Sequence, residues 1–176
     1  MNKKKLASKI LRELRKLHPD AKIALNYKNN MQLLAAVIMS AQCTDKKVNE
    51  VTEKLFKKYI TVDDFANANI KTFEKEIYQT GFYHAKAKNI ISAAKILRKD
   101  FDGIVPRTME QILKLPGVAR KTANVVLGNA YGVVEGIAVD THVKRLSKLY
   151  GLTNEIDPVK IEKDLMQIIP KKDWFK

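Results

Sequence analysis

The fold of this chain is decided by one stretch, Leu115-Pro116-Gly117-Val118-Ala119-Arg120-Lys121-Thr122-Ala123. Its Pro-Gly pair separates two helical patterns, so the stretch predicts a tight turn between two short helices. In such a turn the backbone N–H groups and a helix N-terminus face outward together, a geometry that binds a phosphate without reading a base. Arg120 and Lys121 add positive charge at the same end. The pattern predicts an anion-binding helical hairpin, although spacing alone slightly favours an ordinary corner between two helices.

Helical periodicity extends from this hairpin toward both ends of the chain. Residues 31–40 are apolar on nearly every side, which predicts a buried central helix. We found no convincing alternating strand pattern, so the fold class is all-α. The expected helices cover residues 3–17, 31–40, 84–99, 109–114, 119–130, 141–150 and 158–169, with one more after Thr44 and two short ones beginning near Thr61 and Ile70.

Polar residues in front of these helices are expected to cap them. Thr44, Asp140 and Asp157 stand where an N-cap side chain would accept a first-turn N–H. Thr108 and Gln111 fit a capping box that opens the first hairpin helix. The helix after Thr44 should bury one face, made of Val48, Val51, Leu55 and Tyr59.

The composition is strongly basic, with a formal net charge of +14 spread along the chain. Such an excess favours a polyanionic partner, because neutralising phosphates releases counterions. A lysine-rich composition without that function explains the charge equally well. At 176 residues the chain forms either one compact unit or two small lobes.

The sequence gives little support for a metal-binding, disulfide-bonded or membrane-spanning protein. Cys43 is its single cysteine, and the three histidines, His18, His84 and His142, are scattered, so we expect no metal site. The best apolar run, residues 33–39, is too short to span a bilayer. The N-terminus lacks the apolar core of a signal peptide, so we expect a cytoplasmic protein.

Four segments in order carry a family resemblance. They are 40–45 (Ser-Ala-Gln-Cys-Thr-Asp), 81–87 (Gly-Phe-Tyr-His-Ala-Lys-Ala), the hairpin 115–123, and 137–143 (Ile-Ala-Val-Asp-Thr-His-Val). Together they resemble the helix-hairpin-helix DNA glycosylase superfamily, and within it the endonuclease III branch, over about residues 6–170. The resemblance implies two helical lobes: a barrel domain at 24–134 containing the hairpin, and a second lobe from 1–23 and 135–176.

The resemblance also implies base-excision repair of DNA by a bifunctional glycosylase. Such an enzyme removes oxidised pyrimidines and cleaves the abasic site by β-elimination through a lysine Schiff base. Lys121 matches the nucleophile, and its place beside Arg120 in the first turn of a helix would favour the neutral amine it needs. Asp140 matches the aspartate that supports activation of the nucleophile and stabilises positive charge on the sugar. Its alternative role is that of a helix N-cap.

The remaining site residues would hold the DNA. Gln42 matches the residue that fills the gap left by an extruded base, and Phe82 stands where the family places an apolar wedge. Taken alone, Gln42 is a routine loop residue, Phe82 more often a core aromatic, and His142 as often structural as a backbone contact. The hairpin would grip a phosphate through Gly117, Ala119 and Arg120.

Two departures from the family pattern matter. Ala119 replaces the usual second hairpin glycine, and we expect it to be tolerated in a right-handed helical conformation. The family usually continues into another helix and a four-cysteine loop holding a [4Fe–4S] cluster. With one cysteine, we expect no cofactor in this chain. We also expect a second lobe incomplete at its C-terminus, with Trp174 and Phe175 poorly covered.

The expected partner is double-stranded DNA with damaged bases or abasic sites, bound by a nucleoid-associated monomer without membrane contact. Two alternatives stay open. One is a monofunctional glycosylase without the lyase step, and the other is a non-catalytic hairpin module that only binds DNA. Lys121 argues against both.

Overall fold

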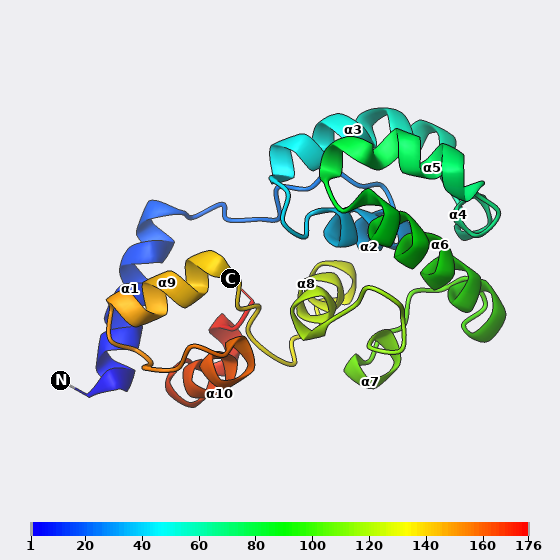
Figure 1. Cartoon of the computed structure of the whole chain (residues 1–176). Helices are drawn as coiled ribbons and strands as arrows, with labels where there is room; N and C mark the ends of the chain where they lie inside the picture. The colour runs from blue at the N-terminus through cyan, green and yellow to red at the C-terminus, as the bar shows by residue number, and fades with distance from the viewer. Residues whose placement is uncertain (1, 176) are drawn as a thin grey trace. The chain divides into compact units, whose positions relative to one another are not determined.

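The computed structural model describes residues 2–175, which form ten α-helices and two short 3₁₀ helices (Figure 1). No strand occurs among these described residues. The all-α fold class predicted from the sequence is therefore confirmed.

The chain divides into two compact units. The first, here called the hairpin unit, runs from Ala24 to Val133. The second, here called the terminal unit, combines the residues up to Ile23 with those from Val134 onward. Both ends of the chain thus build one unit, and the middle of the chain builds the other.

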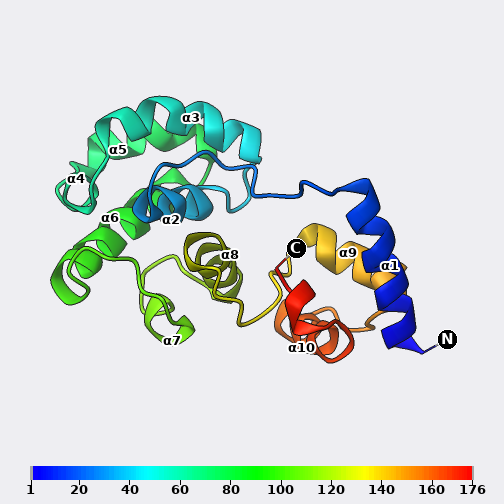
Figure 2. The same ribbon diagram turned by 180° about the vertical axis from the view of Figure 1, so that it is seen from behind.

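The hairpin unit is organised around α2 (Asn30–Met39), in which every residue from Met31 to Met39 is buried. This helix packs against α3 (Asp45–Lys58), α6 (Tyr83–Asp100) and α8 (Arg120–Tyr131) (Figure 1, Figure 2). An apolar surface on all sides needs neighbours on all sides, so the predicted buried central helix is confirmed. The unit is completed by α4 (Val62–Ala66), α5 (Ile70–Ile77), η1 (Tyr78–Thr80) and α7 (Met109–Ile112).

An aromatic cluster fills the end of the hairpin unit where α3, α4 and α5 meet. The ring of Phe73 lies edge-on to Tyr59 at 5.0 Å, and Phe65 lies 6.1 Å from Phe73 between ring centroids. Such pairs add roughly 0.5–1.5 kcal/mol to the burial of the rings themselves. The end of α3 is tied to α2 by the buried Gln32, whose amide donates to the carbonyls of Phe56 and Tyr59.

The terminal unit consists of α1 (Lys3–Leu17), α9 (Thr141–Leu149), α10 (Pro158–Ile168) and η2 (Lys171–Asp173). Trp174 is half-buried against its core, and the indole Nε1 donates to the carbonyl of Ile169 at 2.8 Å. The expectation of poor cover is therefore wrong for Trp174 and correct for Phe175, which is 44% exposed. The buried core residues of this unit are Ala7, Ile137, Val139, Leu152, Ile161 and Leu165.

The predicted N-caps at Thr44, Asp140 and Asp157 are confirmed, because each side chain accepts a backbone N–H of its own helix. The capping box predicted at Thr108 is half present. The Thr108 hydroxyl accepts the N–H of Gln111, as an N-cap does, but it also donates to the side chain of Gln111, which does not reach the backbone N–H of Thr108. The helix ends at Ile112. The complete box stands at Thr61, in front of α4.

The buried face of α3 also differs in part from the prediction. Val51 is only half-buried, whereas Thr52 and Phe56 are buried beside Val48 and Leu55. The buried face is therefore shifted by about one residue around the helix, toward the aromatic cluster.

Candidate nucleic-acid interface

The hairpin turn between α7 and α8 depends on Gly117. Its φ is +78°, a left-handed conformation that L side chains rarely adopt. A Cβ at this position would also lie 2.9 Å from the Cβ of Asn89 on α6. Leu115 and Val118 on either side are buried, and the N–H of Val118 donates to the carbonyl of Leu115 at 3.2 Å. The predicted tight turn is present and is anchored to the hairpin unit by its apolar residues.

The helix after the turn begins without a side-chain cap. Its N-cap is Ala119, at φ −91° and ψ 172°, which has no side-chain oxygen to offer the first-turn N–H groups. The expected right-handed helical conformation of Ala119 is wrong, since the residue is extended, a conformation that alanine adopts without strain. Among the α-helices within residues 2–175, only α6 and α8 lack a side-chain cap. The first-turn N–H groups of α8 therefore have no side-chain cap, as the predicted phosphate-binding turn requires.

The charge at this helix start points to the same conclusion. The first turn of α8 holds no acidic residue, and it carries Arg120 and Lys121 instead. Cations near the positive end of a helix dipole are destabilising by about 0.3–1 kcal/mol each, whereas an anion there is stabilising. Lys121 is exposed, on the side of α8 away from the buried Ala123 and Leu127. The start of α8 therefore combines uncapped N–H groups with two basic residues, and its role as an anion site stays a prediction.

Gln42 and Phe82 share an unusual backbone conformation. Their φ angles are +53° and +48°, and within residues 2–175 the only other non-glycine residue at positive φ is Asp102. Gln42 is exposed in the loop after α2, and Phe82 is 68% exposed at the start of α6. Phe82 is therefore not a core aromatic. Such conformations cost about 1–3 kcal/mol and tend to occur at functional sites.

Sequence reasoning missed one residue between these two loops, Lys86. It is buried on α6 and its Nζ donates to the carbonyls of Met39, at 2.8 Å, and Thr80, at 2.6 Å. Burial lowers its pKa below the ordinary 10.5, and the nearby thiol of Cys43 opposes that shift. The signal was present in the sequence, since a lysine at this position falls on the apolar stripe of α6 that continues through Ile90 and Leu97.

Asp140 and His142 belong to the terminal unit. Asp140 is half-buried, and its Oδ1 accepts the N–H of Val143 at 2.8 Å, so its capping role is confirmed. This bond holds the carboxylate in one orientation at the start of α9. His142 is exposed in the first turn of the same helix. Their catalytic and DNA-binding roles remain predictions.

The residues present do not fit the [4Fe–4S] cluster that the family resemblance implies. Such a cluster ordinarily takes four thiolates, and the sequence supplies Cys43 alone, half-buried between α2 and α3. Within residues 2–175 no group of three or more histidine, cysteine or acidic side chains is placed to hold a metal ion. In the same described part of the chain, no helix combines the length and apolar character needed to cross a membrane.

Comparison with known proteins shows the family of the chain. Residues 35–171 match the family described as the HhH-GPD superfamily base excision DNA repair protein. Endonuclease III of Synechocystis is 51% identical over 173 residues, 98% of this chain and 79% of its own. Endonuclease III of Bacillus subtilis is 45% identical over 159 residues, 90% of this chain and 72% of its own. A trapped endonuclease III–DNA covalent intermediate superposes with a TM-score of 0.94 at 44% identity, covering 99% of this chain and 82% of that one.

Proposed function

Because this chain belongs to the HhH-GPD superfamily of base excision DNA repair proteins, we propose that it excises damaged bases as a DNA glycosylase and cleaves the resulting abasic site as a lyase. It acts in base-excision repair on double-stranded DNA. The substrates are oxidised pyrimidines, as the similarity to endonucleases III suggests. It works as a single chain on the DNA of the nucleoid.

One observation carries the proposed chemistry: Lys121 is an exposed amine at the uncapped start of α8, in a chain similar to an endonuclease III trapped covalently on DNA. The neutral Nζ attacks C1′ of the damaged nucleotide, and the bond from C1′ to the base breaks as the base takes up a proton. Opening of the sugar leaves a Schiff base between Nζ and C1′. Loss of a proton from C2′ then breaks the bond to the 3′ phosphate, and hydrolysis releases Lys121.

Asp140 serves this reaction through a carboxylate held in one orientation by its helix cap. It supports activation of the nucleophile and stabilises the positive charge that develops on the sugar. Capping and catalysis are compatible roles, since the bond to Val143 occupies only Oδ1.

The hairpin binds the DNA backbone, and the loops of Gln42 and Phe82 open the duplex at the damaged base. A phosphate at the start of α8 accepts hydrogen bonds from the first-turn N–H groups, and its negative charge offsets the positive charge of that turn. Gly117 and Ala119 let the DNA backbone approach because neither has a bulky side chain. Gln42 fills the place of the extruded base and bonds its former partner, while Phe82 wedges the neighbouring base step apart. His142 contacts the DNA backbone.

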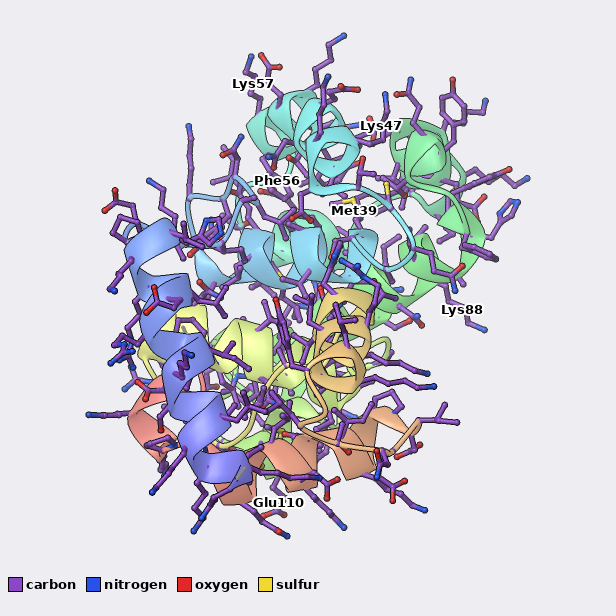
Figure 3. All side chains as sticks on the ribbon, turned by 90° about the vertical axis from the view of Figure 1, so that its left-hand side faces the viewer. Met39, Lys47, Phe56, Lys57, Lys88 and Glu110 are labelled. Carbon is purple, nitrogen blue, oxygen red and sulfur yellow. The ribbon has the colours of Figure 1, made fainter. Side chains whose placement is uncertain are left out.

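Borohydride trapping on abasic-site DNA tests the proposal. The wild-type chain should form a covalent adduct, because reduction fixes a Schiff base to the amine that formed it. Lys121→Ala should form none while it keeps most of its DNA affinity, which is shared among many phosphate contacts. Lys57→Ala, which changes an exposed lysine on α3 (Figure 3), is the matched control and should trap normally.

The same experiment separates the alternatives. Base release without any adduct from the wild-type chain would indicate a monofunctional glycosylase. DNA binding with neither base release nor an adduct would indicate a non-catalytic hairpin module. Trapping by Lys121→Ala at the wild-type level would assign the nucleophile to another amine.

A further inference from the structure

Lys86 bonds to both of the loops that carry strained residues. Its Nζ donates at 2.8 Å to the carbonyl of Met39, the last residue of α2, after which the chain enters the loop of Gln42. The same Nζ donates at 2.6 Å to the carbonyl of Thr80, just before Phe82. The backbone N–H of Lys86 donates to the carbonyl of Phe82 at 3.1 Å. One residue therefore connects two segments that lie far apart in the sequence.

The chemistry of this contact suits an ammonium group. Met39 ends an α-helix and Thr80 ends a 3₁₀ helix, and the last carbonyls of a helix carry partial negative charge without a partner inside the helix. The lysine side chain is only 4% exposed, and its two acceptors are also buried. Water therefore cannot easily replace these bonds. An apolar side chain at the same place would leave both carbonyls buried without their donor.

Packing alone does not require a lysine here. The neighbours on the same face of α6 are Ala87, Ile90 and Leu97, all fully buried and apolar. Lys88, by contrast, is exposed on the opposite side of the helix (Figure 3). A buried charge among apolar neighbours is destabilising unless hydrogen bonds satisfy it, and here the carbonyls of Met39 and Thr80 accept those bonds.

We propose that Lys86 is a positioning residue, which holds the loop of Gln42 and the loop of Phe82 in one fixed arrangement so that both residues enter the duplex together. This inference rests on the proposed function, since it assigns Gln42 and Phe82 to the opening of the duplex. Lys86 touches neither the damaged base nor the sugar, and it acts through the two carbonyls it holds. With the contact intact, the free protein already presents Gln42 and Phe82 in their left-handed conformations, so no loop has to be ordered during base extrusion.

Lys86→Met tests the inference, since methionine fills similar space without donating a hydrogen bond. Excision from damaged duplex should fall about 10- to 100-fold in kcat, the range expected when a site is misplaced by roughly 1 Å. Borohydride trapping on a single-stranded abasic oligonucleotide should stay at the wild-type level, because no base pair has to be opened. A fluorescent adenine analogue opposite the lesion should lose the signal of unstacking. Lys88→Met is the matched control and should equal wild type in every assay.

Lys86→Gln provides a second variant, since its amide can donate to one of the two carbonyls. It should fall between wild type and Lys86→Met in duplex excision. Equal excision from duplex by wild type and Lys86→Met would overturn the inference. So would an equal loss on single-stranded and duplex substrates, or the failure of both variants to fold, because each would assign Lys86 to general stability. Absence of any adduct with the wild-type chain would instead overturn the proposed function.

Discussion

Replacing Gly117 with alanine should disturb the hairpin in two separable ways. The first is backbone strain, since φ is +78° and a left-handed L-residue costs about 1–2 kcal/mol. The second is a steric contact, because the new Cβ would lie 2.9 Å from the Cβ and 3.0 Å from the Nδ2 of Asn89. Overpacking of this kind costs about 1–3 kcal/mol. We therefore expect Gly117→Ala to lower the free energy of unfolding by about 2–5 kcal/mol.

Gly132 offers a matched control at the other end of α8. Its φ is +65°, and a Cβ there would meet nothing within 4 Å. Gly132→Ala should therefore cost only the backbone strain, about 1–2 kcal/mol. The difference between the two variants isolates the contact with Asn89. Gly117→Ala combined with Asn89→Ala should recover part of that difference, since it removes the amide but keeps the Cβ at 2.9 Å.

Urea unfolding followed by circular dichroism measures these changes. With a slope of about 2 kcal/mol per molar urea, Gly117→Ala should shift the midpoint by about 1–2.5 M and Gly132→Ala by under about 1 M. Fluorescence anisotropy with an abasic duplex should show weaker binding by Gly117→Ala alone, because only that variant alters the phosphate-binding turn. Equal midpoints for the two variants, or unchanged DNA binding by Gly117→Ala, would refute the reasoning.

Three further predictions follow from the caps and the strained loops. Asp140→Asn should keep the wild-type melting temperature, because asparagine caps a helix as well as aspartate does. Its excision rate should fall at least about 100-fold, because the carboxylate is lost. A lower melting temperature together with the lower excision rate would show that Asp140 acts only as a cap. Gln42→Ala should slow excision from damaged duplex roughly tenfold while leaving nonspecific DNA affinity unchanged; equal losses in the two assays would contradict the gap-filling role. The N–H groups of Thr61 and Ile60 hold the pKa of Asp64 below its ordinary 3.8. Its contribution to stability is therefore present above about pH 4 and lost as the pH falls through the lowered value, and acid titration of Asp64→Asn should lack this component.

The parts of the fold that follow from local chemistry could be predicted from the sequence. Asp140 and Asp157 stand directly before helical patterns, and a capping bond spans only a few residues. The burial of α2 was also predictable, because its sequence is apolar on nearly every side and leaves no polar face for solvent. The tight turn at Gly117 was predicted from the Pro-Gly pair, and the positive φ of Gly117 agrees with it.

The parts that depend on tertiary neighbours could not be predicted in this way. Phe82 alone is compatible with a core position, whereas in the structure it is exposed and has a left-handed backbone beside Gly81. The role of Lys86 depends on carbonyls of Met39 and Thr80, and neither of them is marked by its residue type. Ala119 was expected to be helical because the helix was predicted to begin one residue earlier than Arg120.

The division of the chain into a middle unit and a unit made of both ends has a consequence for synthesis. The helix α1 leaves the ribosome before the core residues that its Ala7 joins, such as Ile161 and Leu165, have been translated. The hairpin unit is one continuous compact segment, so it can fold once Val133 has emerged. Until residues such as Ile161 and Leu165 have also emerged, the apolar side of α1 lacks its native partners. The positive charge of this segment, with Lys3, Lys4 and Lys5 at its start, favours its solubility during that time.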